Sequence, residues 1–174
     1  MNIKITYYYW IRALSDNQIP VATTHSTPPW YRKNGQAYID KRGVVNGLRC
    51  MDFVPGKECD NLCRGPEPDK RVCDGDPTKC KFLQTYRKQL GKLEIGKVLE
   101  KFERIVEAAE AIKGEKIENP EIVLIVYEAF TKQPCSEAQS IIDYFKSNGI
   151  KIEVFTGEQA KADKLAAEKA KYDF

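Results

Sequence analysis

The stretch from Cys50 to Cys80 is too poor in apolar residues to fold around a hydrophobic core of its own. It holds five of the six cysteines of the chain, separated mainly by Pro, Gly, Asp, Asn and Lys. Ordering the backbone costs about 1–2 kcal/mol per residue, and so few apolar side chains do not offset that cost. This stretch therefore needs a cross-link to hold it.

Metal binding is the cross-link that the cysteine spacing favours. Three residues separate Cys59 from Cys63, a short spacing that is typical of zinc ligands. A structural zinc site forms only in the folded chain, so that its binding energy stabilises the fold. The expected ligands of one zinc ion, any one of which Cys50 could replace, are Cys59, Cys63, Cys73 and Cys80.

Two other arrangements of these cysteines stay open. An iron–sulfur cluster also takes four thiolates, and the spacing alone does not exclude it. The second alternative is a pair of disulfides with a spare thiol, but residues 1–10 are charged and aromatic and lack the apolar region of a secretion signal. We therefore expect a cytoplasmic protein with a metal site.

The composition is that of an ordinary globular protein. Of the 174 residues, 42% are hydrophobic and 30% are charged, and no apolar run is long enough to cross a bilayer. The net charge of +3 is too small to indicate nucleic acid by itself. Cations nevertheless flank the cysteines, either as a binding surface or as a solvated face. They are Arg32, Lys33, Lys41, Arg42, Arg49, Lys79, Lys81, Arg87, Lys88 and Lys92.

Four segments have the composition of strands. Residues 2–12 and 19–24 are rich in aromatic and β-branched side chains, which favour strands. Residues 121–128 have an unbroken apolar middle, as expected of a parallel strand that is covered on both faces. Residues 150–155 predict a further strand, which would complete a right-handed strand–helix–strand unit.

Helical spacing of apolar residues predicts four helices. The first follows Asp76-Pro77-Thr78 and places Cys80 in its first turn. The others are expected over residues 94–113, 136–147 and 158–171, the last with a thin apolar face. We predict one α/β domain over residues 1–157, with a three-layer, mostly parallel sheet flanked by helices and a metal-binding insertion at about residues 50–80. Residues 158–174 form a helical tail that docks on this domain or joins two copies into a homo-oligomer.

The end of the 121–128 strand carries the first candidate site. Ligands of open α/β sheets bind beyond the carboxyl ends of the strands, which is where Glu128 and Cys135 fall. A thiol at a helix N-terminus is activated by the helix dipole. We expect Glu128 to act as a general acid or base and Cys135 as a nucleophile. The alternative is a surface carboxylate and a small residue at a helix start.

The loop after the second strand carries the other candidate site. Two prolines exclude a helix there, and polar and aromatic side chains beyond a strand end are typical of an α/β site. His25, the single histidine of the chain, is the second acid–base candidate or a hydrogen-bonding loop residue. The expected ligand-binding residues are Tyr8, Trp10, Arg12, Ser26, Trp30, Tyr31 and Arg32.

Two stretches resemble the family known as domain of unknown function 488. They are EIVLIVYEAFTKQPCSEAQSIIDYFKSNGIKIEVF, at residues 121–155, and HSTPPWY, at residues 25–31. The family has His and Arg after the cysteine of the first stretch, whereas this chain has Ser136 and Glu137. If those two residues bind an anion in the family, this chain has exchanged a cation for a carboxylate. The resemblance implies an association with mobile elements and DNA metabolism.

The leading expectation is a nucleic-acid- or nucleotide-associated protein that acts on a base. Aromatic side chains would stack on bases, and nearby cations would contact phosphates. Two alternatives remain open. One is a noncatalytic, metal-stabilised module for protein interaction, and the other is a thiol enzyme that uses Cys135.

Overall fold

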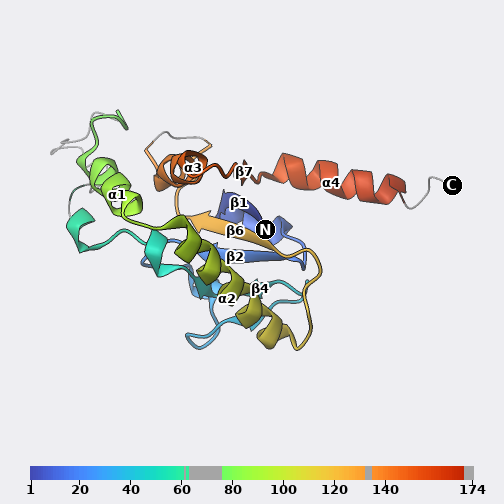
Figure 1. Ribbon diagram of the computed structural model, residues 1–174. Coiled ribbons are helices and arrows are strands. Elements are labelled where there is room, and N and C mark those ends of the chain that lie inside the picture. The colour runs from blue at the N-terminus through green and yellow to red at the C-terminus, as the bar shows by residue number, and fades with distance from the viewer. Residues whose placement is uncertain (61, 63–75, 132–134, 171–174) are drawn as a thin grey trace.

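Five parallel strands form the main sheet of the protein, in the order β5–β2–β6–β1–β7 (Figure 1). The structure is a computed structural model, and it describes residues 1–60, 62, 76–131 and 135–170. The all-parallel sheet, with helices packed on it, confirms the predicted α/β class. The strands are β1 (Asn2–Tyr7), β2 (Gln18–Ala22), β5 (Leu48–Arg49), β6 (Glu121–Val126) and β7 (Glu153–Val154).

Strand β6 lies at the centre of the sheet, as its apolar sequence predicted. It pairs with β1 from Asn2↔Glu121 to Tyr7↔Val126, and on its other side with β2. Residues 122–126 are all buried, with exposures of 0 or 1%. Both faces of this strand are therefore covered by other parts of the chain.

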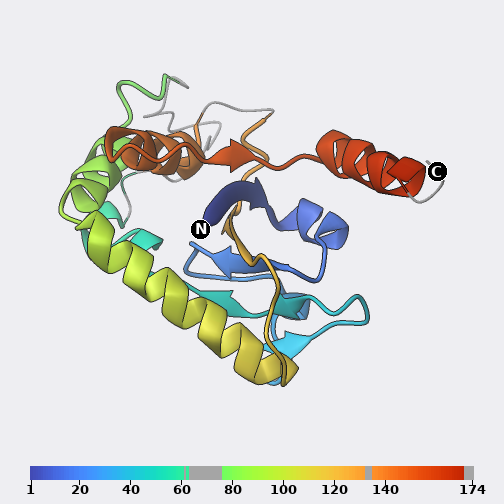
Figure 2. The same ribbon diagram turned by 45° about the vertical axis from the view of Figure 1, so that its right-hand side comes forward.

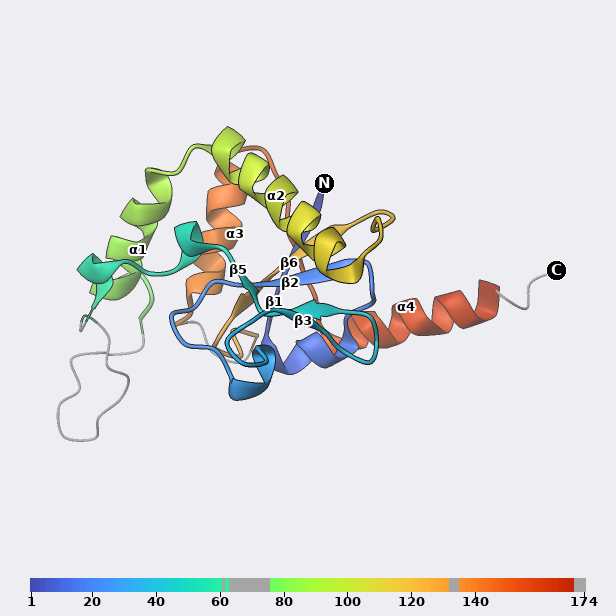
Figure 3. The same ribbon diagram turned by 90° about the horizontal axis from the view of Figure 1, so that it is seen from below.

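Three α-helices cover one face of the sheet (Figure 3). Side chains at alternate strand positions, including Ile5 and Leu124, pack there against Phe102 and Phe145. The prediction of these helices is confirmed, except that Cys80 is the N-cap of the first helix and does not lie within its first turn. The helices are α1 (Lys81–Gly91), α2 (Ile95–Lys113) and α3 (Glu137–Ser147).

The opposite face is covered by 3₁₀ turns, and a small hairpin lies beside β2, in contact with α2. The turns are η1 (Tyr8–Ala13) and η2 (Pro29–Tyr31), and the hairpin pairs β3 (Tyr38–Ile39) with β4 (Val45–Asn46). The first strand, expected over residues 2–12, therefore ends at Tyr7. The strand ends there because the buried residues that follow Tyr7 recur at every third position, and a 3₁₀ helix aligns side chains at i and i+3. The buried residues at this period are Tyr8, Ile11 and Leu14.

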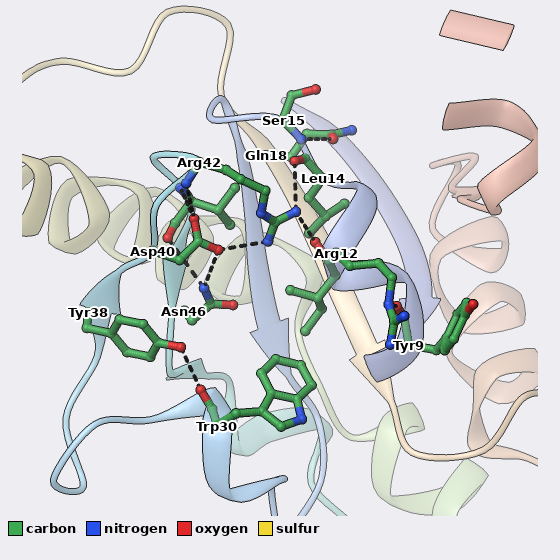
Figure 4. A network of polar contacts seen from close by, with 12 residues as sticks. Tyr9, Arg12, Leu14, Ser15, Gln18, Trp30, Tyr38, Asp40, Arg42 and Asn46 are labelled. Atoms are coloured by element: carbon green, nitrogen blue, oxygen red, sulfur yellow. Dashed lines mark hydrogen bonds and ion pairs between the residues drawn. The ribbon is translucent and has the colours of Figure 1, made fainter. Parts of the chain in front are cut away.

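A partly exposed polar network fastens the hairpin segment to the end of η1 (Figure 4). Arg42 donates from Nη1 to Ile11 O at 2.8 Å, and its Nη2 pairs with Asp40 Oδ2 at 2.7 Å. Asn46 donates to the same carboxylate oxygen at 3.0 Å. Burial raises the pKa of Asp40, but these hydrogen bonds outweigh it and hold that pKa below its usual value. The network therefore holds an ionised carboxylate and fixes the path of the segment that leads to β5.

The C-terminal part of the chain departs most from its prediction. The strand expected over residues 150–155 is only two residues long, and it pairs with β1, not with β6. Helix α4 (Gly157–Ala170) begins against the Trp10 ring of η1 and then leads away from the sheet (Figures 1 and 2). Self-association through this helix stays a prediction. No helix in the described ranges is both long and apolar enough to cross a membrane.

Tyr31 links the strands β2 and β5 by hydrogen bonds from the face of the sheet that η1 covers. Its ring is completely buried, and its hydroxyl lies 2.6 Å from Leu48 O and 3.0 Å from Pro20 O. We expect Tyr31→Phe to lower the free energy of unfolding by about 1–3 kcal/mol, because a buried carbonyl loses its donor. Urea denaturation measures this loss.

Tyr38→Phe is the matched control, since it removes a similar 2.6 Å hydrogen bond, to Trp30 O, at an exposed position. We expect it to change the stability by less than about 0.5 kcal/mol. Equal losses in the two variants would contradict the role assigned to Tyr31.

Candidate functional site

The carboxyl ends of the central strands meet at one edge of the sheet. Tyr7 is in register with Val126, while Ala22 is in register with Ile125 on one side and Arg49 on the other. The residues that follow these strands therefore gather at the edge where α/β proteins bind ligands. Successive side chains of a strand point to opposite faces, and the edge consequently carries two different clusters.

The first is an aromatic cluster, made of Tyr8, Trp30, Tyr31 and Tyr127, on the face covered by η1. Tyr8 lies at its centre, with edge-to-face contacts to the other three rings at centroid distances of 5.5–6.2 Å. Such contacts stabilise aromatic groups in fixed orientations. Tyr8 is buried, but Trp30 and Tyr127 are 49% and 56% exposed. The cluster thus offers two exposed rings on a rigid base.

The expected ligand-binding residues are not all in this cluster. Tyr8 and Trp30 are, and Tyr31 is too, although its full burial gives it the structural role described above. Trp10 and Arg12 belong to η1, in a separate group where the Arg12 guanidinium lies 3.9 Å from the centre of the Tyr9 ring. Two of the predicted residues therefore lie apart from the exposed rings.

Arg32 is held beside the aromatic cluster by the backbone of β4 and β5. Its Nε donates to Gly47 O at 3.0 Å, and its charge acts on the Tyr8 hydroxyl. Gly47 has a φ of 98°, and a Cβ there would lie 2.7 Å from the Ala37 Cα. Only glycine fits this position, so the anchor of Arg32 depends on it.

The second is a carboxyl pair, Glu128 and Glu137, on the side of the edge that faces the helices. The two groups are hydrogen-bonded to each other, and burial together with the Glu128 charge raises the pKa of Glu137 to about 7. Glu128 Oε2 is buried and has no hydrogen-bond partner among the described residues. Because burial and a neighbouring carboxylate both disfavour its ionised form, Glu137 keeps its proton to a higher pH than an ordinary glutamate does.

Helix α3 positions Glu137 for this contact. Ser136 caps the helix by accepting a hydrogen bond from Ala138 N at 3.2 Å, which makes Glu137 the first helical residue. The contact of Glu137 with Glu128 was not predicted from the sequence, in which Glu137 appears only as a departure from a family pattern. The signal available was the short distance in sequence between a strand-ending and a helix-starting carboxylate.

The two other catalytic candidates lie at the same edge. His25 is exposed, and its Nε2–H donates to Pro55 O, because a carbonyl oxygen can only accept. The neutral ring would therefore keep Nδ1 as an acceptor for a ligand. Cys135 is half-buried and directly precedes the Ser136 cap, as expected for a thiol at a helix N-terminus.

The described cysteines show how the two ends of the insertion meet. Cys59 is buried in η4 (Lys57–Cys59), which packs against α1, and Cys80 is the N-cap of that helix. Burial also raises the pKa of the Cys50 thiol to about 11. Cys63 and Cys73 lie outside the described residues. In the ranges that are described, no three His, Cys, Asp or Glu side chains are arranged as a metal site, and the four-cysteine site stays a prediction.

Comparison with known proteins gives no assignment. No protein-family model matches this chain, and neither a curated protein nor a solved structure matches it. The likeness to domain of unknown function 488 rests on the quoted residues alone. Functional inference therefore starts from the two clusters at the carboxyl edge.

The carboxyl pair makes stability depend on pH. The pKa of Glu137 is about 7 in the folded chain against an ordinary 4.5, so the folded state holds a proton that the unfolded state releases. Stability must then fall as the pH rises from about 4.5 to 7. We expect Glu137→Gln to remove this loss, and to be more stable than the wild type by about 2–3 kcal/mol at pH 8.

Chemical denaturation at pH 4.5 and pH 8 measures this difference, with Glu107→Gln on the exposed face of α2 as the control for a lost charge. The control is expected to follow the wild type at both pH values. A Glu137→Gln variant whose stability parallels the wild type across this range would show that the pair does not share a proton.

Proposed function

We propose that this protein binds a nucleotide or a single-stranded nucleic acid at the carboxyl edge of its sheet. The observation that supports this function is the pair of exposed rings, Trp30 and Tyr127, fixed by the buried Tyr8. Stacking of a base on an aromatic side chain contributes about 1–3 kcal/mol. Arg32 and Lys33 lie next to Trp30 in the chain and supply positive charge for phosphates.

The carboxyl pair gives this site its acid–base chemistry. In a pair that shares one proton, one carboxyl group donates while the other accepts, and a pKa of about 7 suits proton transfer at neutral pH. We assign Glu128 as the general base and Glu137 as the residue that holds the proton. His25 Nδ1 is a second acceptor and Cys135 is a nucleophile at the same edge. We propose that these groups act on the base of the bound nucleotide.

Removing the exposed ring of Trp30 tests the binding proposal. We expect Trp30→Ala to weaken binding of a labelled single-stranded oligonucleotide about tenfold or more, because one stacking contact is lost. Fluorescence anisotropy at two salt concentrations measures the affinity, with DNA and RNA, single-stranded and double-stranded. Binding is expected to weaken as salt rises.

Met51→Ala is the control, since Met51 is 60% exposed but offers no ring. It is expected to bind as the wild type does. Absence of salt-sensitive binding to all four nucleic acids, and to nucleotides, would exclude the proposed function.

We also propose that a zinc ion holds the insertion through Cys59, Cys63, Cys73 and Cys80. The packing of η4 on α1, which brings the segments ending at Cys59 and beginning after Cys80 into contact, supports this site. We expect about one zinc per chain, and its loss in Cys59→Ser, because a three-thiolate site binds zinc more weakly. Elemental analysis of anaerobically purified protein measures it.

Cys135→Ser is the control and is expected to retain the metal. If the protein is brown and contains iron and labile sulfide, the cysteines bind an iron–sulfur cluster and not zinc. Protein without any bound metal would contradict it.

A further inference from the structure

Arg49 lies at the carboxyl edge on the same face as the aromatic cluster. It ends the two-residue strand β5 and is in direct register with Ala22 of β2. Partner residues of neighbouring parallel strands point to the same face, and Ala22 packs in the core that contains Tyr8 and Tyr31. The charge of Arg49 accordingly acts on the Tyr8 hydroxyl.

The guanidinium of Arg49 has hydrogen-bonding capacity that the described chain does not use. Its Nε is buried and has no hydrogen-bond partner, and no carboxylate of the described residues forms an ion pair with it. A buried, unpaired N–H of a charged group is destabilising. The residue as a whole is only half-buried, so that a ligand from solvent can reach it.

The groups that act on Tyr8 together with Arg49 are Arg32, Tyr127 and Thr24, none of which is a carboxylate. The second charge acting on Tyr8 is that of Arg32, whose Nε is already bound to Gly47 O. Thr24 Oγ1 lies 2.6 Å from both the Tyr8 hydroxyl and Ser26 O. Since the Ser26 carbonyl can only accept, Thr24 donates to it and Tyr8 donates to Thr24. The charges of two arginines thus act on the Tyr8 hydroxyl, which is itself hydrogen-bonded to Thr24.

We propose that Arg49, with Arg32 beside it, binds the phosphate group of the ligand whose base stacks on Trp30 and Tyr127. A phosphate accepts two parallel hydrogen bonds from one guanidinium, and such charge-assisted bonds are stronger than neutral ones. The ligand supplies an anion to a guanidinium that forms no ion pair with the described residues. This inference rests on the proposed function and deepens it, because it assigns a phosphorylated nucleotide or a nucleic-acid backbone, and not a free base or nucleoside.

Matched ligands with and without phosphate test this site. Calorimetric titration of the full chain with adenosine, with adenosine monophosphate and with inorganic phosphate separates the base from the phosphate. We expect the monophosphate to bind at least tenfold more tightly than adenosine. Arg49→Gln is expected to remove that advantage and to leave the affinity for adenosine unchanged.

Two further variants control for charge and for folding. Arg104→Gln removes an exposed guanidinium from α2, on the opposite face, and should bind all three ligands as the wild type does. Arg49→Lys keeps the charge but not the planar fork, so a loss of more than about threefold for the monophosphate supports the site even where Arg49→Gln does not fold. Titration with a single-stranded oligonucleotide shows whether the bound phosphate belongs to a nucleotide or to a nucleic-acid backbone. A lower salt dependence in Arg49→Gln, by about one unit of slope, indicates backbone contacts.

Failure of this inference is distinguishable from failure of the proposed function. If Arg49→Gln folds and binds the monophosphate as tightly as the wild type, the phosphate site is overturned while the aromatic site stands. Equal affinity of the wild type for adenosine and adenosine monophosphate would also overturn the phosphate site and leave the aromatic site standing. If neither nucleotide nor oligonucleotide binds to the wild type, both proposals are overturned.

Discussion

The structure depends on the burial of β6 on both of its faces. A strand with five consecutive buried apolar residues must be covered from two sides, and the burial of each such side chain stabilises the fold by about 1.5–3 kcal/mol. The three α-helices cover one side, and the 3₁₀ turns η1 and η2 with Val44 and Phe155 cover the other. The elements that carry the aromatic cluster and Glu137, namely η1, η2 and α3, therefore also shield this strand.

That burial explains why the carboxyl edge carries two kinds of chemistry. Where β6 ends, Tyr127 continues toward the η1 face and Glu128 toward the helices, because strand side chains alternate. Tyr127 meets an aromatic layer, and its ring stays exposed at the rim. Glu128 meets the start of α3, where its charge, together with burial, raises the pKa of Glu137. One alternation thus separates a surface suited to stacking from a pair suited to proton transfer.

The fold was largely predictable because its signals are long. The β6 strand and the helices α2 and α3 have apolar patterns over many residues, and Glu128 could be placed at the edge from them. The η1 turn was missed because its period of three, over Tyr8, Ile11 and Leu14, lies within a run that reads as a strand. Strand β5 has two residues, too few for any pattern. Arg49 therefore appeared only as one cation among many, and its position depends on a tertiary pairing.

A carboxyl group at the first position of α3, and not a cation, decides what the edge can do. An arginine at the first position of α3 would pair with Glu128 and keep it ionised, which would leave a weak base and no acid. A second carboxyl group instead retains a proton at neutral pH, so the pair can both give and accept one. The positive charge needed to hold an anion must then come from elsewhere along the edge. In the proposed phosphate site, Arg49 and Arg32 on the opposite face would supply it without neutralising the carboxyl pair.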